Sequence, residues 1–177
     1  VKYHIGDGPE VTSSGNEGEL SKFLGDNAMK VTQLSVIGNL NDADISLLQE
    51  MAGQTKETDS EVTGSLKSLN LSEATFTTTD QIHKEDKRVP DKIFQNCKNL
   101  QQVNLSNMTE IGQWAFQNSA LTEISIPATV TKIGVGAFSG NSAVTKVTVS
   151  STQIDARSYD GEDNIFSGMD PNKVQVV

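Results

Sequence analysis

Residues 111–116 read Ile-Gly-Gln-Trp-Ala-Phe, and this stretch decides the fold because it returns 22 residues later, at 133–138, as Ile-Gly-Val-Gly-Ala-Phe. In both copies a threonine and a charged residue come directly before the isoleucine. Shorter Ile-Phe copies lie at 93–94, one period before the first full copy, and at 165–166, after a longer interval. Recurrence at a period of this length is typical of proteins built from stacked repeats.

Alternating apolar runs predict short strands. One follows each of these copies, and two more precede the first copy. The pattern aliphatic-x-x-aliphatic-x-aliphatic occupies residues 31–36, 66–71, 100–105, 121–126 and 144–149, with a reduced form at 174–176. Alternation rich in β-branched residues is typical of a strand with one buried face. The Ile-Gly-x-x-Ala-Phe part predicts a turn followed by a short helical or 3₁₀ turn, with its Ala and Phe pointing inward.

A longer unit precedes the regular repeats. Residues 42–52 are expected to form an α-helix, because Ile45 and Leu48 fall on one face. Asn41 or Asp42 would cap its start, and Gly53 would end it. The first unit is therefore expected to carry a true α-helix on its outer side.

The N-terminal segment, residues 1–30, is expected to cover the open end of the core. Leu20, Phe23 and Leu24 predict a short helix that ends at Gly25. Residues 1–18 are mostly polar and rich in glycine, and we expect them to be mobile. Loops are expected over residues 54–64, 77–89 and 150–164.

These patterns predict an α/β solenoid with a parallel β-sheet on one face and short helices or turns on the other. A unit of 22 residues cannot bury its apolar face alone, whereas stacked units bury phenylalanine on phenylalanine. Residues 1–30 would form the N-terminal segment and capping helix, and residues 31–177 the solenoid, within a single domain. The low hydrophobic content of 35% fits such a thin repeat protein.

Charge and hydropathy exclude several classes of partner. The net charge of -9 and the pI of about 4.6 disfavour binding to nucleic acid and to anionic membranes. No apolar run approaches the roughly 20 residues of a transmembrane segment. The chain starts at Val1, so we expect upstream residues to have been removed, and whether they held a secretion signal stays open.

The paired Ile-Gly-x-x-Ala-Phe units, with Leu-x-x-Ile-x-Ile-Pro at 121–127, resemble the BspA-like leucine-rich repeat family. The resemblance is specific over residues 89–149, and segment 34–51 resembles the N-terminal repeat that often precedes such arrays. It implies a leucine-rich-repeat solenoid in an extracytoplasmic bacterial protein, secreted or anchored at the cell surface. It also implies binding to protein or glycan, with host extracellular matrix among the ligands of some members.

The chain departs from this family at the position after the phenylalanine, which is often cysteine. Only Cys97 keeps that cysteine, and Ser119 and Asn141 stand near it in the next two copies. A single cysteine can form neither an internal disulfide nor a thiolate zinc cluster. Because Cys97 falls in the repeat register, we interpret it as a small buried hydrophobe rather than a nucleophile.

The sequence contains no constellation that favours catalysis, and we predict neither enzymatic activity nor a cofactor. The histidines are His4, near the start, and His83, in a charged loop. No Gly-x-Ser-x-Gly elbow or phosphate-binding glycine loop is present. Acids are abundant, but nothing singles out a carboxylate pair for glycoside cleavage.

Two local features leave alternatives open. Asp160, Glu162 and Asp163 lie in an acidic loop that would offer oxygen ligands to calcium, although the spacing departs from an EF-hand and favours a solvated insertion. Trp114 either packs against the neighbouring unit or forms an exposed aromatic contact.

The outward-facing strand residues form the candidate binding site. A central column is expected to hold Ser35, Asn70, Asn104, Ser125, Thr148 and Gln175. A neighbouring column is expected to hold Gln33, Ser68, Gln102, Glu123, Lys146 and Lys173. These polar columns resemble an adaptable hydrogen-bonding surface for protein or glycan, unless they are ordinary solvated strand residues. Few aromatic side chains stand among them, which argues against a compact high-affinity interface unless the loops contribute.

Three functions remain open. The absence of a catalytic pattern and the family resemblance favour a non-catalytic binding or adhesion module at the cell surface. A structural spacer or display domain with no ligand of its own is the main alternative. A hydrolase built from scattered acids is the least favoured, and neither the ligand nor the oligomeric state can be predicted.

Overall fold

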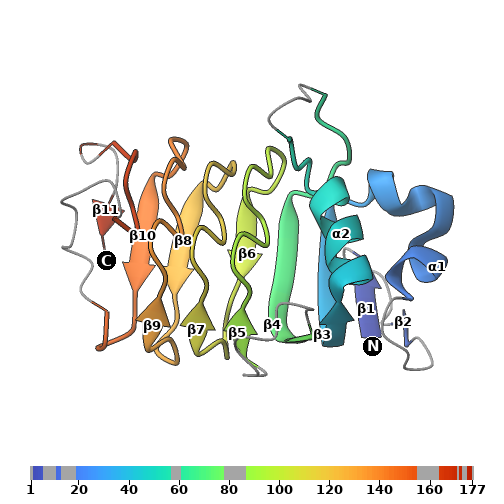
Figure 1. Ribbon diagram of the computed structural model, residues 1–177, viewed down its shortest axis with the longest axis horizontal. Helices are drawn as coiled ribbons and strands as arrows, with labels where there is room; N and C mark the ends of the chain where they lie inside the picture. The colour runs from blue at the N-terminus through green and yellow to red at the C-terminus, as the bar shows by residue number, and fades with distance from the viewer. Residues whose placement is uncertain are drawn as a thin grey trace.

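The computed structural model describes residues 2–5, 11–12, 19–56, 61–77, 87–154, 164–170, 172 and 175–176. Its elements are β1 (Lys2–Ile5), β2 (Val11–Thr12), α1 (Leu20–Leu24), the 3₁₀ helix η1 (Gly25–Lys30), β3 (Gln33–Asn41), α2 (Asp42–Met51), β4 (Ser68–Thr77), β5 (Arg88–Val89), β6 (Gln102–Asn104), β7 (Glu110–Ile111), β8 (Glu123–Ile126), β9 (Lys132–Ile133), β10 (Lys146–Val149) and β11 (Gln175–Val176). The strands stand side by side along the long axis, and the helices gather at the N-terminal end (Figure 1).

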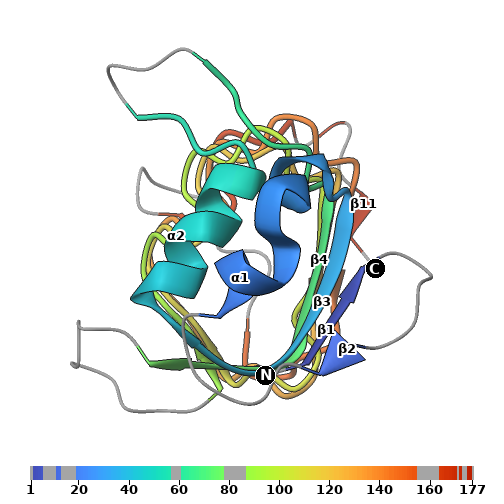
Figure 2. The same cartoon turned by 90° about the vertical axis from the view of Figure 1, so that its right-hand side faces the viewer.

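Parallel strands form one face of the molecule, as the alternating runs predict. The strands β3, β4 and β6 pair in parallel, and so do β8, β10 and β11. Seen along the stack, these strands lie opposite helix α2 (Figure 2). Within the described residues they belong to separate sheets, although the amide of Thr122 donates to the carbonyl of Gln101 at 3.0 Å between β6 and β8. The arrangement is a stack of repeats with parallel strands and few helices.

A second sheet lies where the sequence predicts only turns. The two-residue strands β5, β7 and β9 pair in parallel, and β7 and β9 include the charged residue that precedes each Ile-Gly. Their register aligns Arg88, Glu110 and Lys132, which form a row of alternating charge. The Arg88 and Lys132 side chains both face Glu110, at 3.5 and 3.9 Å. The charged residue of the repeat therefore has a structural partner in the neighbouring unit.

Hydrogen-bonded turns follow this second sheet and carry the phenylalanines. The amides of Phe94 and Phe116 each donate to the alanine carbonyl of the next repeat at 2.7 Å, and Phe138 donates to Ile165 at 2.9 Å. Neighbouring units are thus bonded on the turn side as well as on the sheet side. In the described residues these segments are hydrogen-bonded turns, and the amides of Gln117 and Ser139 each donate to the carbonyl three residues earlier, so no helix extends beyond a single turn.

A column of four phenylalanines runs through the core. The ring centroids of Phe94 and Phe116 are 5.8 Å apart, those of Phe116 and Phe138 are 5.4 Å apart, and those of Phe138 and Phe166 are 6.0 Å apart. The rings are stacked, and all four are buried. Offset stacking of this kind adds about 0.5–1.5 kcal/mol per pair beyond the burial of area. The repeats are therefore held in register through their largest apolar side chain.

Polar side chains complete the turns beside this column. Asn141 is fully buried, and its Nδ2 donates to the carbonyls of Phe116 and Phe138, both at 2.8 Å. Its Oδ1 accepts from the amide of Leu121 at 3.3 Å. One repeat earlier, the Ser119 hydroxyl donates to the Phe94 carbonyl at 2.6 Å. These side chains satisfy backbone groups that burial would otherwise leave without partners.

The helical first unit begins as the sequence predicts. The side chain of Asn41 accepts from the amides of Ala43 and Asp44, and the Asp44 carboxylate accepts in turn from the Asn41 amide. Asp44 is also buried and accepts from the amide of Leu20 at 3.1 Å, which ties α1 to α2. Helix α1 ends at Gly25, as predicted. The two helices thus cover the core at this end.

The N-terminal residues differ from expectation. The sequence predicts a mobile polar segment over residues 1–18, but β1 pairs antiparallel with β3 and with β2. Strands β3 and β4 also extend well beyond the predicted runs, to Asn41 and Thr77. The antiparallel strand covers the edge of β3, which a parallel sheet would otherwise leave open.

The phenylalanine column yields a stability prediction. We expect Phe116→Ala to lower the free energy of unfolding by about 3–5 kcal/mol, because it removes a fully buried ring that stacks on two others. Chemical denaturation monitored by circular dichroism measures this loss. The control is Val135→Ala, since Val135 lies in the next turn but is 38% exposed. A loss below about 1 kcal/mol for Phe116→Ala would contradict the role of the stack.

The buried asparagine yields a second prediction. Asn141→Ala should destabilise the protein by at least about 1–3 kcal/mol, because buried backbone groups lose a side-chain partner. Asn141→Ser should lose less, since a serine serves in the preceding repeat. The exposed neighbour Ser142 supplies the control, Ser142→Ala. Equal unfolding midpoints for Asn141→Ala and Ser142→Ala would show that these hydrogen bonds contribute nothing net.

Candidate functional site

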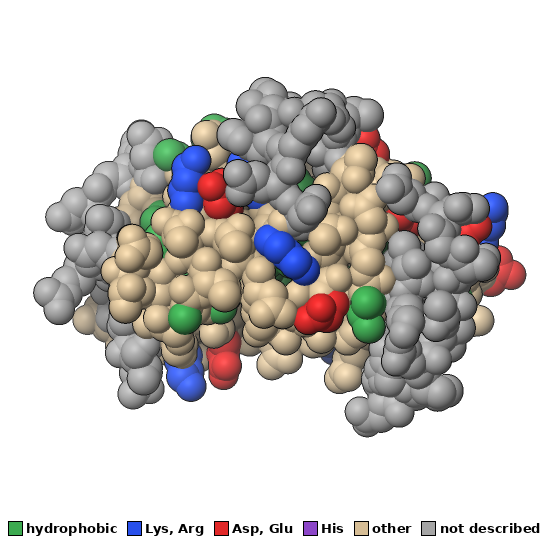
Figure 3. Space-filling view, turned by 90° about the horizontal axis from the view of Figure 1, so that it is seen from below, with side chains coloured by type: hydrophobic (Ala, Val, Ile, Leu, Met, Phe, Trp, Pro, Cys, Tyr) green, Lys and Arg blue, Asp and Glu red, His purple; other side chains and the backbone are tan. Residues whose placement is uncertain are grey.

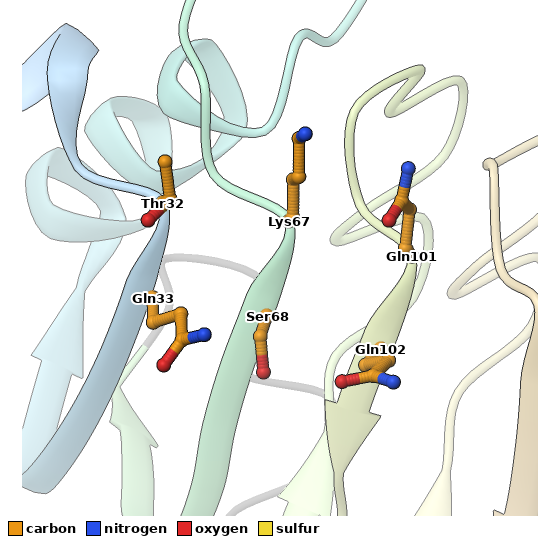
Figure 4. Close-up of a pocket in the computed structure, with 6 residues that line it drawn as sticks. All are labelled: Thr32, Gln33, Lys67, Ser68, Gln101 and Gln102. Atoms are coloured by element: carbon orange, nitrogen blue, oxygen red, sulfur yellow. The ribbon is translucent and has the colours of Figure 1, made fainter. Parts of the chain in front are cut away.

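A shallow groove lies on the outward face of β3, β4 and β6. It has a volume of about 320 Å³ and is lined by Thr32, Gln33, Lys67, Ser68, Gln101 and Gln102. Each of the three neighbouring strands contributes its first residue and the residue before it, and all six side chains are polar (Figure 4). The groove therefore crosses the strands rather than running along one of them.

Backbone pairing fixes the two rows of this groove. Gln33, Ser68 and Gln102 are register partners, which places them in one row across the strands. In the other row, the Lys67 amide donates to the Thr32 carbonyl at 2.9 Å. The Gln101 amide donates in turn to the Lys67 carbonyl at 2.8 Å. Both rows are thus held by the ladder rather than by their own side chains.

The side chains of the groove are free to meet a ligand. Within the described residues, none of the six takes part in a side-chain hydrogen bond or an ion pair, and most are exposed. Lys67 is the only charged side chain among them. Amides and hydroxyls both donate and accept hydrogen bonds, so this surface suits a polar ligand.

Sequence reasoning predicts half of this groove. It places Gln33, Ser68 and Gln102 in one column, as the register confirms. It misses the row of Thr32, Lys67 and Gln101, because these residues precede the strands. A signal is present in the sequence: two consecutive polar residues separate the first and second apolar positions of each strand pattern.

Side chains of the predicted central column form local hydrogen bonds in this part of the sheet. Ser35, Asn70 and Asn104 are register partners. The Oδ1 atoms of Asn70 and Asn104 accept from the amides two residues on, Ser72 at 3.0 Å and Ser106 at 2.9 Å. These local bonds stabilise the turn after Asn104 and the register irregularity after Asn70 inside β4. Their free capacity for a ligand is accordingly smaller than that of the groove side chains.

The second half of the predicted surface lies on β8 and β10. Glu123 pairs with Lys146 and Ser125 with Thr148, as expected. Gln175 pairs with Lys146, so its expected place beside Thr148 is wrong by two positions. The cause is the irregular last repeat, which is longer than the two regular repeats directly before it. Lys173 lies outside the described residues.

Trp114 packs between neighbouring units, as one of its two interpretations predicts. Its ring lies 5.2 Å from the Lys92 ammonium of the preceding repeat. On its other side, an added Cβ at Gly136 would lie 2.7 Å from the ring. Trp114 and Gly136 occupy the same turn position, and both have positive φ. A glycine is needed at residue 136 because the tryptophan covers it.

Charges on the lower face of the molecule are scattered. Figure 3 shows a few acidic and basic side chains there, some of them next to each other, with uncharged surface between the groups. Continuous basic surface is the electrostatic footprint of nucleic-acid binding. The described part of this face offers no such footprint.

Metal and membrane interpretations receive no support from the described residues. No cluster of three or more His, Cys, Asp or Glu able to hold a metal occurs in the part of the chain that the structure describes. His83 and the calcium candidates Asp160, Glu162 and Asp163 lie outside that part. In the same ranges no helix is long and apolar enough to cross a membrane.

Cys97 is a buried hydrophobe, as predicted. It has no exposed surface, and its burial raises the pKa of the thiol far above its usual value, against a smaller opposing effect of Lys98. The thiolate is the reactive form of cysteine, so this side chain is unsuited to nucleophilic chemistry.

This burial predicts slow thiol chemistry. In the folded protein at pH 8, we expect an aromatic disulfide reagent to leave Cys97 unmodified, whereas one thiol should react completely in denaturant. Absorbance of the released thiolate measures both reactions. Rapid modification of the folded protein would contradict the burial of this side chain.

Two comparisons with known proteins gave matches. A leucine rich cell surface protein from Faecalibacterium prausnitzii A2-165, of known structure, is 23% identical with a TM-score of 0.38. The match covers 76% of this chain and 45% of that protein, so this chain spans less than half of its length. None of the curated proteins matches the chain. Residues 67–175 match the family described as BspA type Leucine rich repeat region, in 6 copies. Because this match spans more than half of the sequence, the chain belongs to the BspA-type leucine-rich repeat family.

Proposed function

We propose that this chain is a non-catalytic binding or adhesion module that contacts protein or glycan through the outer face of its parallel strands. The observation that carries the proposal is the groove over β3, β4 and β6, where six polar side chains have no partner within the described residues. Leucine-rich repeat families are generally non-catalytic, which supports the same interpretation. Glu123, Ser125, Lys146 and Thr148 would extend the contact toward the C-terminal end.

The proposed setting is extracytoplasmic, with the protein secreted or anchored at the bacterial cell surface. In this setting the repeats would act as one solenoid, and host extracellular matrix would be among the ligands. Membership of the BspA-type family supports this setting. The acidic surface, with a net charge of -9, fits a module that avoids anionic membranes.

A spacer or display domain is the second candidate. It is favoured by one observation, the use of the Asn70 and Asn104 oxygens in hydrogen bonds to nearby backbone amides. In a spacer, outward strand residues would serve the fold and solubility alone. The two functions therefore differ in what they predict for the groove.

A binding comparison separates them. Wild-type protein would be screened against immobilised matrix proteins and a glycan array, beside the triple variant Gln33→Ala, Ser68→Ala, Gln102→Ala. We expect the triple variant to bind at least about tenfold more weakly, because it removes three polar contacts from one row. Surface plasmon resonance gives the affinities.

The matched control is Gln113→Ala, which removes an exposed glutamine from the turn side. Its affinity should equal that of the wild type, and thermal unfolding should show that both variants are folded. A wild-type chain that binds nothing in the screen would favour the spacer. Ligands that bind the triple variant as tightly as the wild type would place the contact elsewhere.

A further inference from the structure

We propose that the groove over β3, β4 and β6 binds a linear glycan that contains a carboxylate-bearing sugar, with the Lys67 ammonium on the carboxylate. This inference rests on the proposed function and names the ligand class for the same site. Its basis is the composition of the groove, which has one ammonium group among uncharged amides and hydroxyls. A ligand matched to it has many hydroxyls and few negative charges.

The spacing of the groove supports a glycan that lies across the strands. Neighbouring strands are about 4.8 Å apart, and successive pyranose units of a linear glycan repeat at a similar distance. Each strand offers its first residue together with the polar residue before it: 32–33 at β3, 67–68 at β4 and 101–102 at β6. Three consecutive sugars could therefore each face an equivalent pair. The pairs stay in step because the backbone register aligns them.

The charge of Lys67 points to a carboxylate at the middle sugar. Its side chain is exposed and has no ion-pair partner among the described residues, while both flanking strands present only uncharged groups to the groove. The whole chain carries a charge of -9, so a densely charged polyanion would be repelled. A glycan with an isolated carboxylate is attracted by Lys67 and is repelled less strongly by the net negative charge of the chain.

An extended peptide fits this groove less well. A peptide rises about 3.4 Å per residue, so when laid across the strands it falls out of step with their spacing of about 4.8 Å. Laid along the strands, it would need an open strand edge for main-chain pairing, but β4 is paired on both sides. The lining also contains no aromatic side chain to anchor a compact protein contact.

Calorimetric titration with two matched saccharides tests the inference. The probes are a linear trisaccharide with one uronic acid between two neutral sugars and its methyl ester, which keeps the sugars but removes the charge. We expect the acid to bind wild-type protein and Lys67→Gln to weaken that binding about two- to fivefold, the range for one exposed charged pair. The ester should bind wild type and Lys67→Gln equally and weakly. The preference for the acid should shrink as salt is raised.

The control variant is Lys22→Gln, which removes the same charge from an exposed site on α1, away from the groove. It should bind the acid like the wild type. The double variant Gln33→Ala, Gln102→Ala should weaken both probes, because it removes uncharged contacts that both sugars share.

The outcomes separate this inference from the proposed function. Equal binding of acid and ester, or equal losses in Lys67→Gln and Lys22→Gln, would overturn the carboxylate assignment while binding itself stands. If neither saccharide binds but an acidic hexapeptide or a matrix protein binds through the groove, the glycan proposal is wrong. The proposal of a binding module then stands. If no probe of either class binds, both proposals fail.

Discussion

The stacking of Phe94, Phe116, Phe138 and Phe166 is the contact on which the other features depend. A ring buried between two rings fixes the distance between repeats, and the turns that carry the rings must then approach closely enough to form backbone hydrogen bonds. Those bonds are present from repeat to repeat on the turn side. The strands on the opposite face inherit the same spacing. Of the three strands of the groove, only β6 follows a phenylalanine of this column, so the rows on β3 and β4 depend on their own ladder.

Burial of the phenylalanine column also buries backbone carbonyl groups, and a different side chain hydrogen-bonds to them in each repeat. Carbonyl groups beside the buried rings cannot reach water, and a buried group without a partner costs about 1–3 kcal/mol. Asn141 bonds two of these carbonyls and an amide, whereas Ser119 bonds one carbonyl. Cys97, at the related place, is only a weak donor and lies 3.9 Å from the Gln95 carbonyl. Departure from cysteine therefore strengthens hydrogen bonding without changing the stack.

Periodicity predicts the strands, the turns and the phenylalanines because each of these repeats a clear apolar pattern. It cannot predict β5, β7 and β9, since a strand of two residues has no alternation to detect. Strand β1 escapes prediction because its pairing with β3 is set by tertiary context in a polar segment. The predicted place of Gln175 is wrong because the longer last repeat shifts its register. Half of the groove is missed because Lys67 and its row precede the strands.

The groove is confined to β3, β4 and β6 for a reason that lies in the backbone. Between these strands the ladder aligns consecutive residues on three neighbours, so equivalent side chains stand in rows. Between β6 and β8 the described backbone contact is the bond from Thr122 to Gln101, and the next row changes to Glu123 and Lys146. A ligand that binds the uncharged side chains of the groove would contact charged side chains beyond β6. Recognition by this chain would consequently depend less on the regular repeats than on the longer first unit, whose helix α2 and strands β3 and β4 set the groove in place.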